Sequence, residues 1–216
     1  MLSDVLRTVS VELPKGFEAQ AKAFLDLLKE WNQRINLVSR KQTDEDLEAH
    51  LLASLAPLEL FPKVEDRPAF DVSRGTMDLL DVGSGGGFPA IPLLLARPEW
   101  RGELVEATAK KCHFLREAAE RLVPQRAEVV NARYEELEPE REVYGLITVR
   151  AVTIDPALAT RARWQMLRQG FFAGHAPTAP EAQEAVRHAL AEAGFEAVEL
   201  RRVEWARCTL AIGRKP

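Results

Sequence analysis

The chain has 216 residues, a formal net charge of −4 and a pI near 5.7, and 46% of its residues are hydrophobic. This length suits one α/β domain with a modest extension, and the acidic balance excludes nucleic-acid binding through an overall basic surface, so any such surface must be local. Cys112 and Cys208 are not spaced like metal ligands, and no secretory leader precedes them, so we expect a reduced cytoplasmic protein without a metal. No apolar run is long enough to span a membrane, so we also expect no membrane contact.

Two helices are predicted in the first part of the chain. Apolar residues recur at helical spacing, with charges between them, and predict an amphipathic helix over residues 17–34. Thr43 and the three acidic residues after it suit a helix N-terminus, and leucines at helical spacing extend that helix to about Pro57.

A connecting segment follows these helices. Prolines, a glycine and charges in residues 61–77 predict a loop or a short irregular helix before the first strand. We therefore expect residues 1–60 to form a helical extension that packs on a core domain of residues 61–216.

The most informative stretch follows, from Asp78 to Leu95. A short apolar run ends at the acidic Asp81, four glycines then fill five positions over 83–87, and prolines stand at the opening of the next apolar segment, where a helix tolerates them. This order predicts a strand, a glycine turn and a helix. Glycines permit positive φ and allow a ligand to approach main-chain N–H groups at the positive end of a helix, so the stretch predicts a site for a nucleotide-like cofactor.

Strands and helices alternate in the rest of the chain. The predicted elements are strand 104–107, a helix capped by Thr108, strand 127–130, a turn or short helix over 133–137, strand 145–149, helix 155–168, strand 170–173, helix 181–193 and a hairpin of 197–203 with 208–212. This alternation predicts an α/β fold with a mostly parallel seven-stranded sheet, right-handed crossovers and an antiparallel C-terminal edge.

Two cofactors fit the glycine loop. Residues 85–90 satisfy the dinucleotide pattern G-x-G-x-x-G/A, so the loop alone leaves an NAD enzyme open. The order D-x-G-x-G-x-G is formed by Asp81, Gly83, Gly85 and Gly87. It favours S-adenosylmethionine over a dinucleotide. A carboxylate at this position would repel a diphosphate, but it can accept hydrogen bonds from the ammonium group of a methionine moiety, directly or through water. Glu106, at the end of the second strand, suits the ribose hydroxyls of either cofactor.

The sequence contains no recognisable constellation of a nucleophile and a base. The four histidines, among them His50 and His175, have no Ser, Asp or Cys partner at a familiar spacing. A missing base is compatible with methylation of an atom that already carries a lone pair. Arg150 lies just after the fourth strand, at the edge where open α/β sheets bind ligands, so it contacts phosphate, base or cofactor, or pairs with a nearby acid.

At these residues the sequence resembles the bacterial RsmG family, formerly called GidB, of small-subunit ribosomal RNA guanine-N7 methyltransferases. The resemblance runs from about Leu27 to the C-terminus, and its most specific part is the Gly-Phe-Pro-x-Ile-Pro-Leu continuation of the glycine loop. The other matched pieces are Trp31-Asn32 with Ile35-Asn36-Leu37, His50 with Ser54, Arg97-Pro98, Lys110-Lys111 with Phe114-Leu115, Arg133 with Glu135, and Arg150-Ala151.

The resemblance implies a class I (Rossmann-like) S-adenosylmethionine-dependent methyltransferase fold. It also implies S-adenosylmethionine as donor, S-adenosylhomocysteine as product, and a guanosine in the decoding-region loop of 16S rRNA, free or in the 30S subunit, as acceptor. N7 of guanine is an exposed lone pair, which agrees with the absence of a base. We expect a monomer. The residues alone leave open a small-molecule or protein acceptor, and a ribosome-associated binding protein that kept the fold.

The resemblance also assigns roles to individual residues. On the cofactor side it implies Gly83 and Phe88 at the methionine end, Glu106, Ala107 and Thr108 at the ribose and adenine, Tyr134 and Glu135 at the adenine edge, and Arg150 at the mouth where cofactor and RNA meet. On the substrate side it implies Asn36, His50, Ser54 and Arg133.

Three positions depart from the family's usual pattern on the presumed substrate side. Ala53 stands where an acid is usual, Val149 where a serine is usual, and His175-Ala176 where Lys-Gly is usual. We expect His175 to remain basic only in part, near its ordinary pKa.

Overall fold

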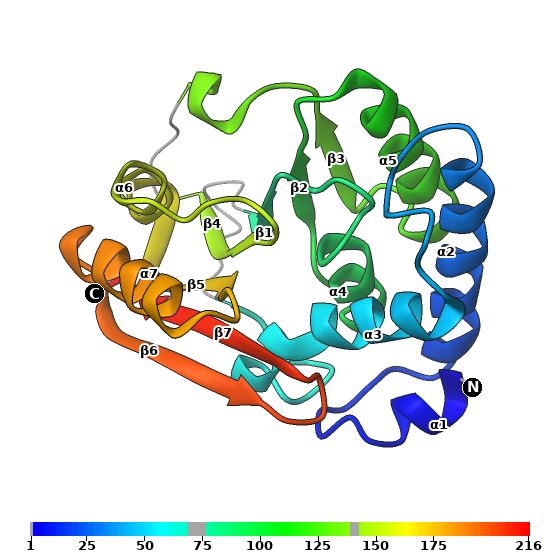
Figure 1. Ribbon diagram of the computed structural model, residues 1–216, viewed down its shortest axis with the longest axis horizontal. Helices are drawn as coiled ribbons and strands as arrows, with labels where there is room; N and C mark the ends of the chain where they lie inside the picture. The colour runs from blue at the N-terminus through cyan, green and yellow to red at the C-terminus, as the bar shows by residue number, and fades with distance from the viewer. Residues whose placement is uncertain (1, 69–76, 139–142) are drawn as a thin grey trace.

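A seven-stranded sheet organises the computed structural model of the chain, which describes residues 2–68, 77–138 and 143–216 (Figure 1). The strands are β1 (Met77–Val82), β2 (Gly102–Val105), β3 (Ala127–Val130), β4 (Tyr144–Val149), β5 (Met166–His175), β6 (Glu196–Val203) and β7 (Cys208–Arg214). Their order across the sheet is β3-β2-β1-β4-β5-β7-β6.

Strands β1 to β5 pair in parallel, whereas β7 pairs antiparallel with both β5 and β6. The predicted α/β class with a mostly parallel sheet is therefore confirmed. The predicted antiparallel C-terminal edge is confirmed as well: the hairpin of β6 and β7 ends the sheet, with β7 next to β5 and β6 outermost. The chain order reverses between β1 and β4, and the carboxyl ends of strands at such a switch point form the usual ligand crevice of open α/β sheets.

Helices cover both faces of the sheet (Figure 1). They are α1 (Leu2–Leu6), α2 (Phe17–Asn32), α3 (Asp44–Leu55), η1 (Ala56–Leu60), α4 (Ala90–Ala96), α5 (Ala109–Leu122), η3 (Tyr134–Glu136), α6 (Pro156–Gln165) and α7 (Pro180–Glu192). Helices α2 to α5 pack with Leu79 and Leu146 in one hydrophobic cluster, while α6 and α7 pack with Leu80 and Ile147 in another. Successive strand residues point to opposite faces, so the apolar strands β1 and β4 supply both clusters.

The N-terminal helices share a core with the sheet. Phe24 and Leu28 of α2 and Leu51 of α3 are fully buried in the cluster that contains Leu79 of β1. The buried surface thus continues across residue 60, and the division into 1–60 and 61–216 stays a prediction.

Most predicted elements match the structure to within a few residues, but the helix predicted over 155–168 was wrong at its end. Helix α6 stops at Gln165 and β5 begins at Met166, which pairs with Tyr144 of β4. Residues 166–168 carry good helix formers, and pairing with the central strand overrides that local preference. The short helix α1 was not predicted. Of the segment 61–77, residues 69–76 lie outside the described residues.

A capping box fixes the start of α3, the helix that carries His50 and Ser54. Thr43 Oγ1 accepts a hydrogen bond from the Asp46 amide at 3.3 Å, and Asp46 Oδ2 accepts one from the Thr43 amide at 2.8 Å. The predicted N-terminus at Thr43 is therefore confirmed. Thr108 also stands at an N-cap position, before α5, but its side chain makes no capping bond.

This difference supports a stability prediction. Thr43→Ala should lower the free energy of unfolding by about 1 kcal/mol, because one helix-terminal amide loses its partner. Urea denaturation followed by circular dichroism measures the change. Thr108→Ala is the matched control and should cost clearly less; equal losses in the two variants would contradict the capping account.

Candidate functional site

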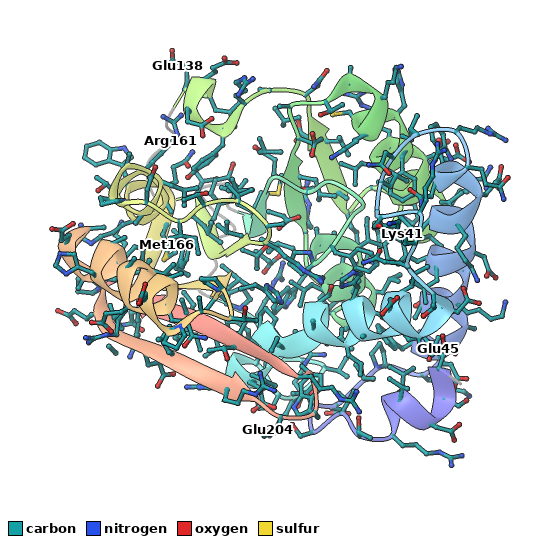
Figure 2. The ribbon with its side chains drawn as sticks, in the orientation of Figure 1. Lys41, Glu45, Glu138, Arg161, Met166 and Glu204 are labelled. Atoms are coloured by element: carbon teal, nitrogen blue, oxygen red, sulfur yellow. The ribbon has the colours of Figure 1, made fainter. Side chains whose placement is uncertain are left out.

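A pocket of about 500 Å³ lies at the carboxyl ends of β1, β2 and β4, at the switch point of the sheet. The loop between α2 and α3, in which Figure 2 labels Lys41, contributes to its wall. The lining consists of Leu37–Ser39, Gln42, His50, Val82–Gly86, Phe88, Val105–Ala107, Lys111, Ala132–Glu135 and Arg150–Val152.

The glycine loop forms the floor between β1 and α4. Gly83 has a φ of 74°, and a Cβ atom there would lie 2.6 Å from Val152 Cγ2. Any side chain at this position would therefore be strained and would collide with the opposite wall. Gly87 has a different role, since it does not line the pocket and a Cβ atom there would lie 3.2 Å from the Phe24 ring. Gly87 thus allows α2 to pack closely against the loop.

Glu106 connects the glycine loop to the start of α5. Its Oε2 accepts a hydrogen bond from the Gly85 amide at 3.0 Å, and its Oε1 accepts one from the Thr108 amide at 2.7 Å. The side chain is 7% exposed and lines the pocket. Each carboxylate oxygen has a second lone pair, so Glu106 can hold the loop and still accept hydrogen bonds from the hydroxyl groups of a ligand.

Asp81 lies beneath this loop and does not line the pocket. It is fully buried, and its Oδ1 accepts a hydrogen bond from Thr148 Oγ1 at 2.8 Å. Its Oδ2 has no hydrogen-bond partner among the described residues. Burial raises the pKa of Asp81 to about 6, while the Thr148 hydrogen bond and the charge of Arg150 act in the opposite direction. An acceptor without a partner under the pocket floor suits a cationic ligand above it.

Arg150 joins β4 to helix α3 on the other side of the pocket. Its Nη1 donates to the His50 carbonyl at 3.1 Å and to Ser54 Oγ at 3.2 Å, and its Nη2 lies 2.6 Å from His50 Nδ1. The guanidinium also lies 5.6 Å from the centre of the Phe88 ring, a cation–π distance. Among the described residues no carboxylate lies within salt-bridge distance of Arg150, so the ion pair considered from the sequence does not form there.

Burial lowers the pKa of Arg150, and burial together with the Arg150 charge lowers the pKa of His50. Arginine stays charged because its ordinary pKa is so high, whereas His50 is neutral at pH 7. The part of the pocket wall next to Phe88 therefore carries a buried cation beside a neutral imidazole.

His175 corrects one expectation. Its Nε2 donates to the Ala53 carbonyl at 2.8 Å, and it does not line the pocket. Burial, reinforced by the charge of Arg150, lowers the pKa of His175 to about 4. The expectation of a partly charged side chain near its ordinary pKa was therefore wrong: His175 is neutral at pH 7, and its bond to Ala53 links β5 to α3.

The structure brings most of the predicted site residues to the pocket. Those that line it are His50, Gly83, Gly85, Phe88, Glu106, Ala107, Arg133, Tyr134, Glu135 and Arg150. Those that do not are Asn36, Ser54, Asp81, Gly87, Thr108 and His175. Asn36 is exposed in the loop after α2, and Ser54 is buried behind Arg150, with its Oγ donating to the His50 carbonyl at 2.7 Å. The roles assigned to all of these residues stay predictions.

Sequence reasoning missed several lining residues, including Gln42, Lys111 and Val152. Val152 follows Arg150 at the end of β4, so the strand-end rule that selected Arg150 could have found it. Gln42 lies in a loop with no motif of its own, and only the packing of α3 brings it to the pocket.

In residues 2–68, 77–138 and 143–216, none of the helices has both the length and the apolar composition that a membrane span requires. No three His, Cys, Asp or Glu side chains gather there in a way that could hold a metal ion.

Two solved structures with a similar fold are methyltransferases. An O-methyltransferase family 2 protein from Planctomyces limnophilus, solved with apigenin, superposes with a TM-score of 0.64 at 18% identity, over 90% of this chain and 65% of that one. Magnesium protoporphyrin IX methyltransferase from Synechocystis, solved with bound S-adenosylmethionine, gives a TM-score of 0.60 at 13% identity, over 91% of this chain and 97% of that one. These likenesses confirm the class I methyltransferase fold.

Three sequence relatives carry the name ribosomal RNA small subunit methyltransferase G. The Geobacter sulfurreducens protein is 33% identical over 93% of this chain and 88% of its own length, and the Pelotomaculum thermopropionicum protein is 39% identical over 84% and 72%. The match to the Nitrosospira multiformis protein, 37% identical, covers 62% of this chain and only 56% of that protein.

The family model for rRNA small subunit methyltransferase G, GidB, matches residues 17–172. This range extends from the first residue of α2 into β5 and includes every residue that lines the pocket. The chain therefore belongs to the rRNA small subunit methyltransferase G family.

Proposed function

We propose that this protein transfers a methyl group from S-adenosylmethionine to N7 of a guanosine in the decoding-region loop of 16S rRNA. The observation that carries the proposal is a single pocket that the glycine loop and Glu106 line together with Arg150 and His50. Family membership supplies the substrate class. We further propose that the protein acts in the cytoplasm as a monomer, on free rRNA or on the 30S subunit.

The glycine-loop side of the pocket fits S-adenosylmethionine. Gly83 leaves space that a Cβ atom would fill, and Glu106 offers acceptors for ribose hydroxyls. The buried carboxylate of Asp81 adds negative potential below the floor, where it attracts an ammonium or a sulfonium group. A dinucleotide would bring its diphosphate toward the same buried acid, which disfavours NAD.

When bound, S-adenosylmethionine supplies a methyl group on a sulfonium sulfur, which passes to a lone pair while the S–C bond breaks. The residues of the chain hold and orient the two partners. Neutral His50 has its Nδ1 engaged by Arg150, which keeps that nitrogen from removing a proton. N7 of guanine has no proton to lose, so methylation of this acceptor needs no general base in the pocket.

The pocket rim offers local basic groups despite the net charge of −4. Lys111 and Arg133 both line the pocket, and Arg133 is exposed. Such groups attract RNA phosphates, and this attraction weakens as the salt concentration rises. The basic groups at this rim therefore support an RNA acceptor for an acidic protein.

Methyl transfer to RNA tests the proposal. The protein is incubated with methyl-labelled S-adenosylmethionine and either 16S rRNA or 30S subunits that lack this modification. We expect label in the RNA of at least one of the two. Absence of label from both, with label in a small-molecule or protein acceptor, would select another enzyme class; donor binding without transfer to any acceptor would select a binding protein that kept the fold.

The buried acid makes donor binding depend on pH. The pKa of Asp81 is raised to about 6, and a cationic ligand favours the ionised form, so affinity for S-adenosylmethionine should rise as the pH increases from 5 to 7. Calorimetric titrations at these pH values measure the affinity. Asp81→Asn should bind more weakly at pH 7 and lose most of this dependence; an unchanged pH profile in the variant would contradict the role of Asp81.

A further inference from the structure

Among the described residues, one polar end of the Gln42 side chain has no hydrogen-bond partner. Gln42 lies in the loop before α3 and lines the pocket next to His50. One end of its amide contacts His50 Nε2. The other end is buried and has no hydrogen-bond partner among the described residues. A buried polar atom without a hydrogen bond costs free energy unless a ligand forms a hydrogen bond with it.

Arg150 decides which nitrogen of His50 carries the proton. A guanidinium group has only donors, so His50 Nδ1, 2.6 Å from Arg150 Nη2, must accept. His50 is neutral at pH 7, since burial and the Arg150 charge both lower its pKa. Its single ring proton therefore lies on Nε2, the nitrogen that faces Gln42.

The His50 proton in turn orients the Gln42 amide. His50 Nε2–H is a donor and needs an acceptor, which only the oxygen end of a carboxamide can provide. The two ends of a carboxamide are distinguished by their hydrogen-bond partners, so we assign the oxygen to the end that faces His50. The amino group then occupies the buried position without a protein partner. Arg150, His50 and Gln42 thus form a relay that leaves a hydrogen-bond donor on Gln42, which is one of the residues that line the pocket.

A donor next to the reacting edge distinguishes the purines. Guanine carries the acceptor O6 beside N7, whereas adenine carries an amino group, a donor, at the same position. We propose that Gln42 is a specificity-determining residue that donates a hydrogen bond to O6 of the target guanine and so excludes adenine-like bases. This inference rests on the proposed function, because it assumes a guanine acceptor.

The base analogue 2,6-diaminopurine tests the inference in 16S rRNA. It keeps N7 and the 2-amino group and replaces O6 with an amino group. The wild type should methylate guanosine about 10- to 100-fold better, in kcat/KM, than the analogue at the target position. Gln42→Met removes the donor at similar volume, and should lower kcat/KM for guanosine about 10- to 100-fold and erode the preference, with S-adenosylmethionine affinity unchanged.

Gln33→Met is the matched control, because Gln33 is exposed on the same loop and does not line the pocket. Gln33→Met should keep the wild-type kcat/KM for guanosine and the wild-type preference for guanosine over 2,6-diaminopurine. If Gln42→Met retained the full preference for guanosine while Gln33→Met behaved as the wild type, the inference would be overturned and the methylation proposal would stand.

A measurement without turnover separates the two proposals. In ¹⁵N NMR of the whole protein, His50 should show a protonated Nε2 and an unprotonated Nδ1, and guanosine monophosphate, but not adenosine monophosphate, should shift the Gln42 amide signals. These results in a protein that leaves rRNA unlabelled would support the guanine site and reject the rRNA reaction. A proton on Nδ1, or equal shifts with both nucleotides, would overturn the assignment of Gln42.

Discussion

Gly83→Val is expected to abolish measurable binding of S-adenosylmethionine. Gly83 lines the pocket with a φ of 74°, a region that costs a β-branched residue about 1–2 kcal/mol or more. A Cβ atom at Gly83 would already lie 2.6 Å from Val152 Cγ2. The two further methyl groups of valine must therefore enter the space that the donor needs. Calorimetry with the wild type and the variant measures the loss.

The control separates loss of the pocket from backbone strain. Gly16 has a similar φ of 85° before α2, and nothing lies within 4 Å of the Cβ position there. Gly16→Val should lower the melting temperature and leave donor affinity unchanged. Circular dichroism establishes that each variant is folded. A folded Gly83→Val protein with wild-type donor affinity would refute the placement of the donor over the glycine loop.

Arg150→Ala should impair methyl transfer more than donor binding. The substitution removes the hydrogen bonds to His50 and Ser54 and the contact with the Phe88 ring, so helix α3 loses its connection to β4 in the pocket. It also removes the group that fixes the His50 proton. Loss of a positioned charged donor typically costs 10²–10³-fold in turnover, and we expect kcat for rRNA methylation to fall by about that factor.

Donor affinity of Arg150→Ala should stay within about threefold of the wild type, because Glu106 and the glycine loop are untouched. Steady-state kinetics and calorimetry on the same preparation separate the two quantities. Arg187→Ala is the matched control, since Arg187 is exposed on α7 and pairs only with Glu184 among the described residues. A larger loss in donor affinity than in turnover would show that Arg150 belongs to the donor site.

Local patterns in the sequence predicted the elements that form the pocket. The apolar run that ends at Asp81, the glycine turn and the acid at Glu106 each follow rules that act within a few residues. The same rules placed Arg150 at a strand end, and parallel pairing of β1, β2 and β4 then gathers these ends at one edge. This part of the site was predictable because parallel strands place their carboxyl ends at the same edge of the sheet, so residues that local patterns identify at separate strand ends lie close together.

Properties that arise from tertiary packing were not predictable in the same way. His175 and Asp81 have shifted pKa values because other elements bury them, and sequence spacing carries no measure of that burial. Met166 belongs to a strand instead of the predicted helix because it pairs with Tyr144 of β4. Gln42 became part of the pocket through its contact with His50, which depends on how α3 packs against the sheet.

The position of the transferred methyl group tests the account most directly. After reaction with labelled donor, the 16S rRNA is digested, the labelled fragment is sequenced, and the modified base is identified by mass spectrometry and by strand scission specific for 7-methylguanosine. We predict one methyl group per 16S rRNA, on N7 of a guanosine in the decoding-region loop. A label on a ribose, on another base or on another nitrogen of guanine would contradict the account.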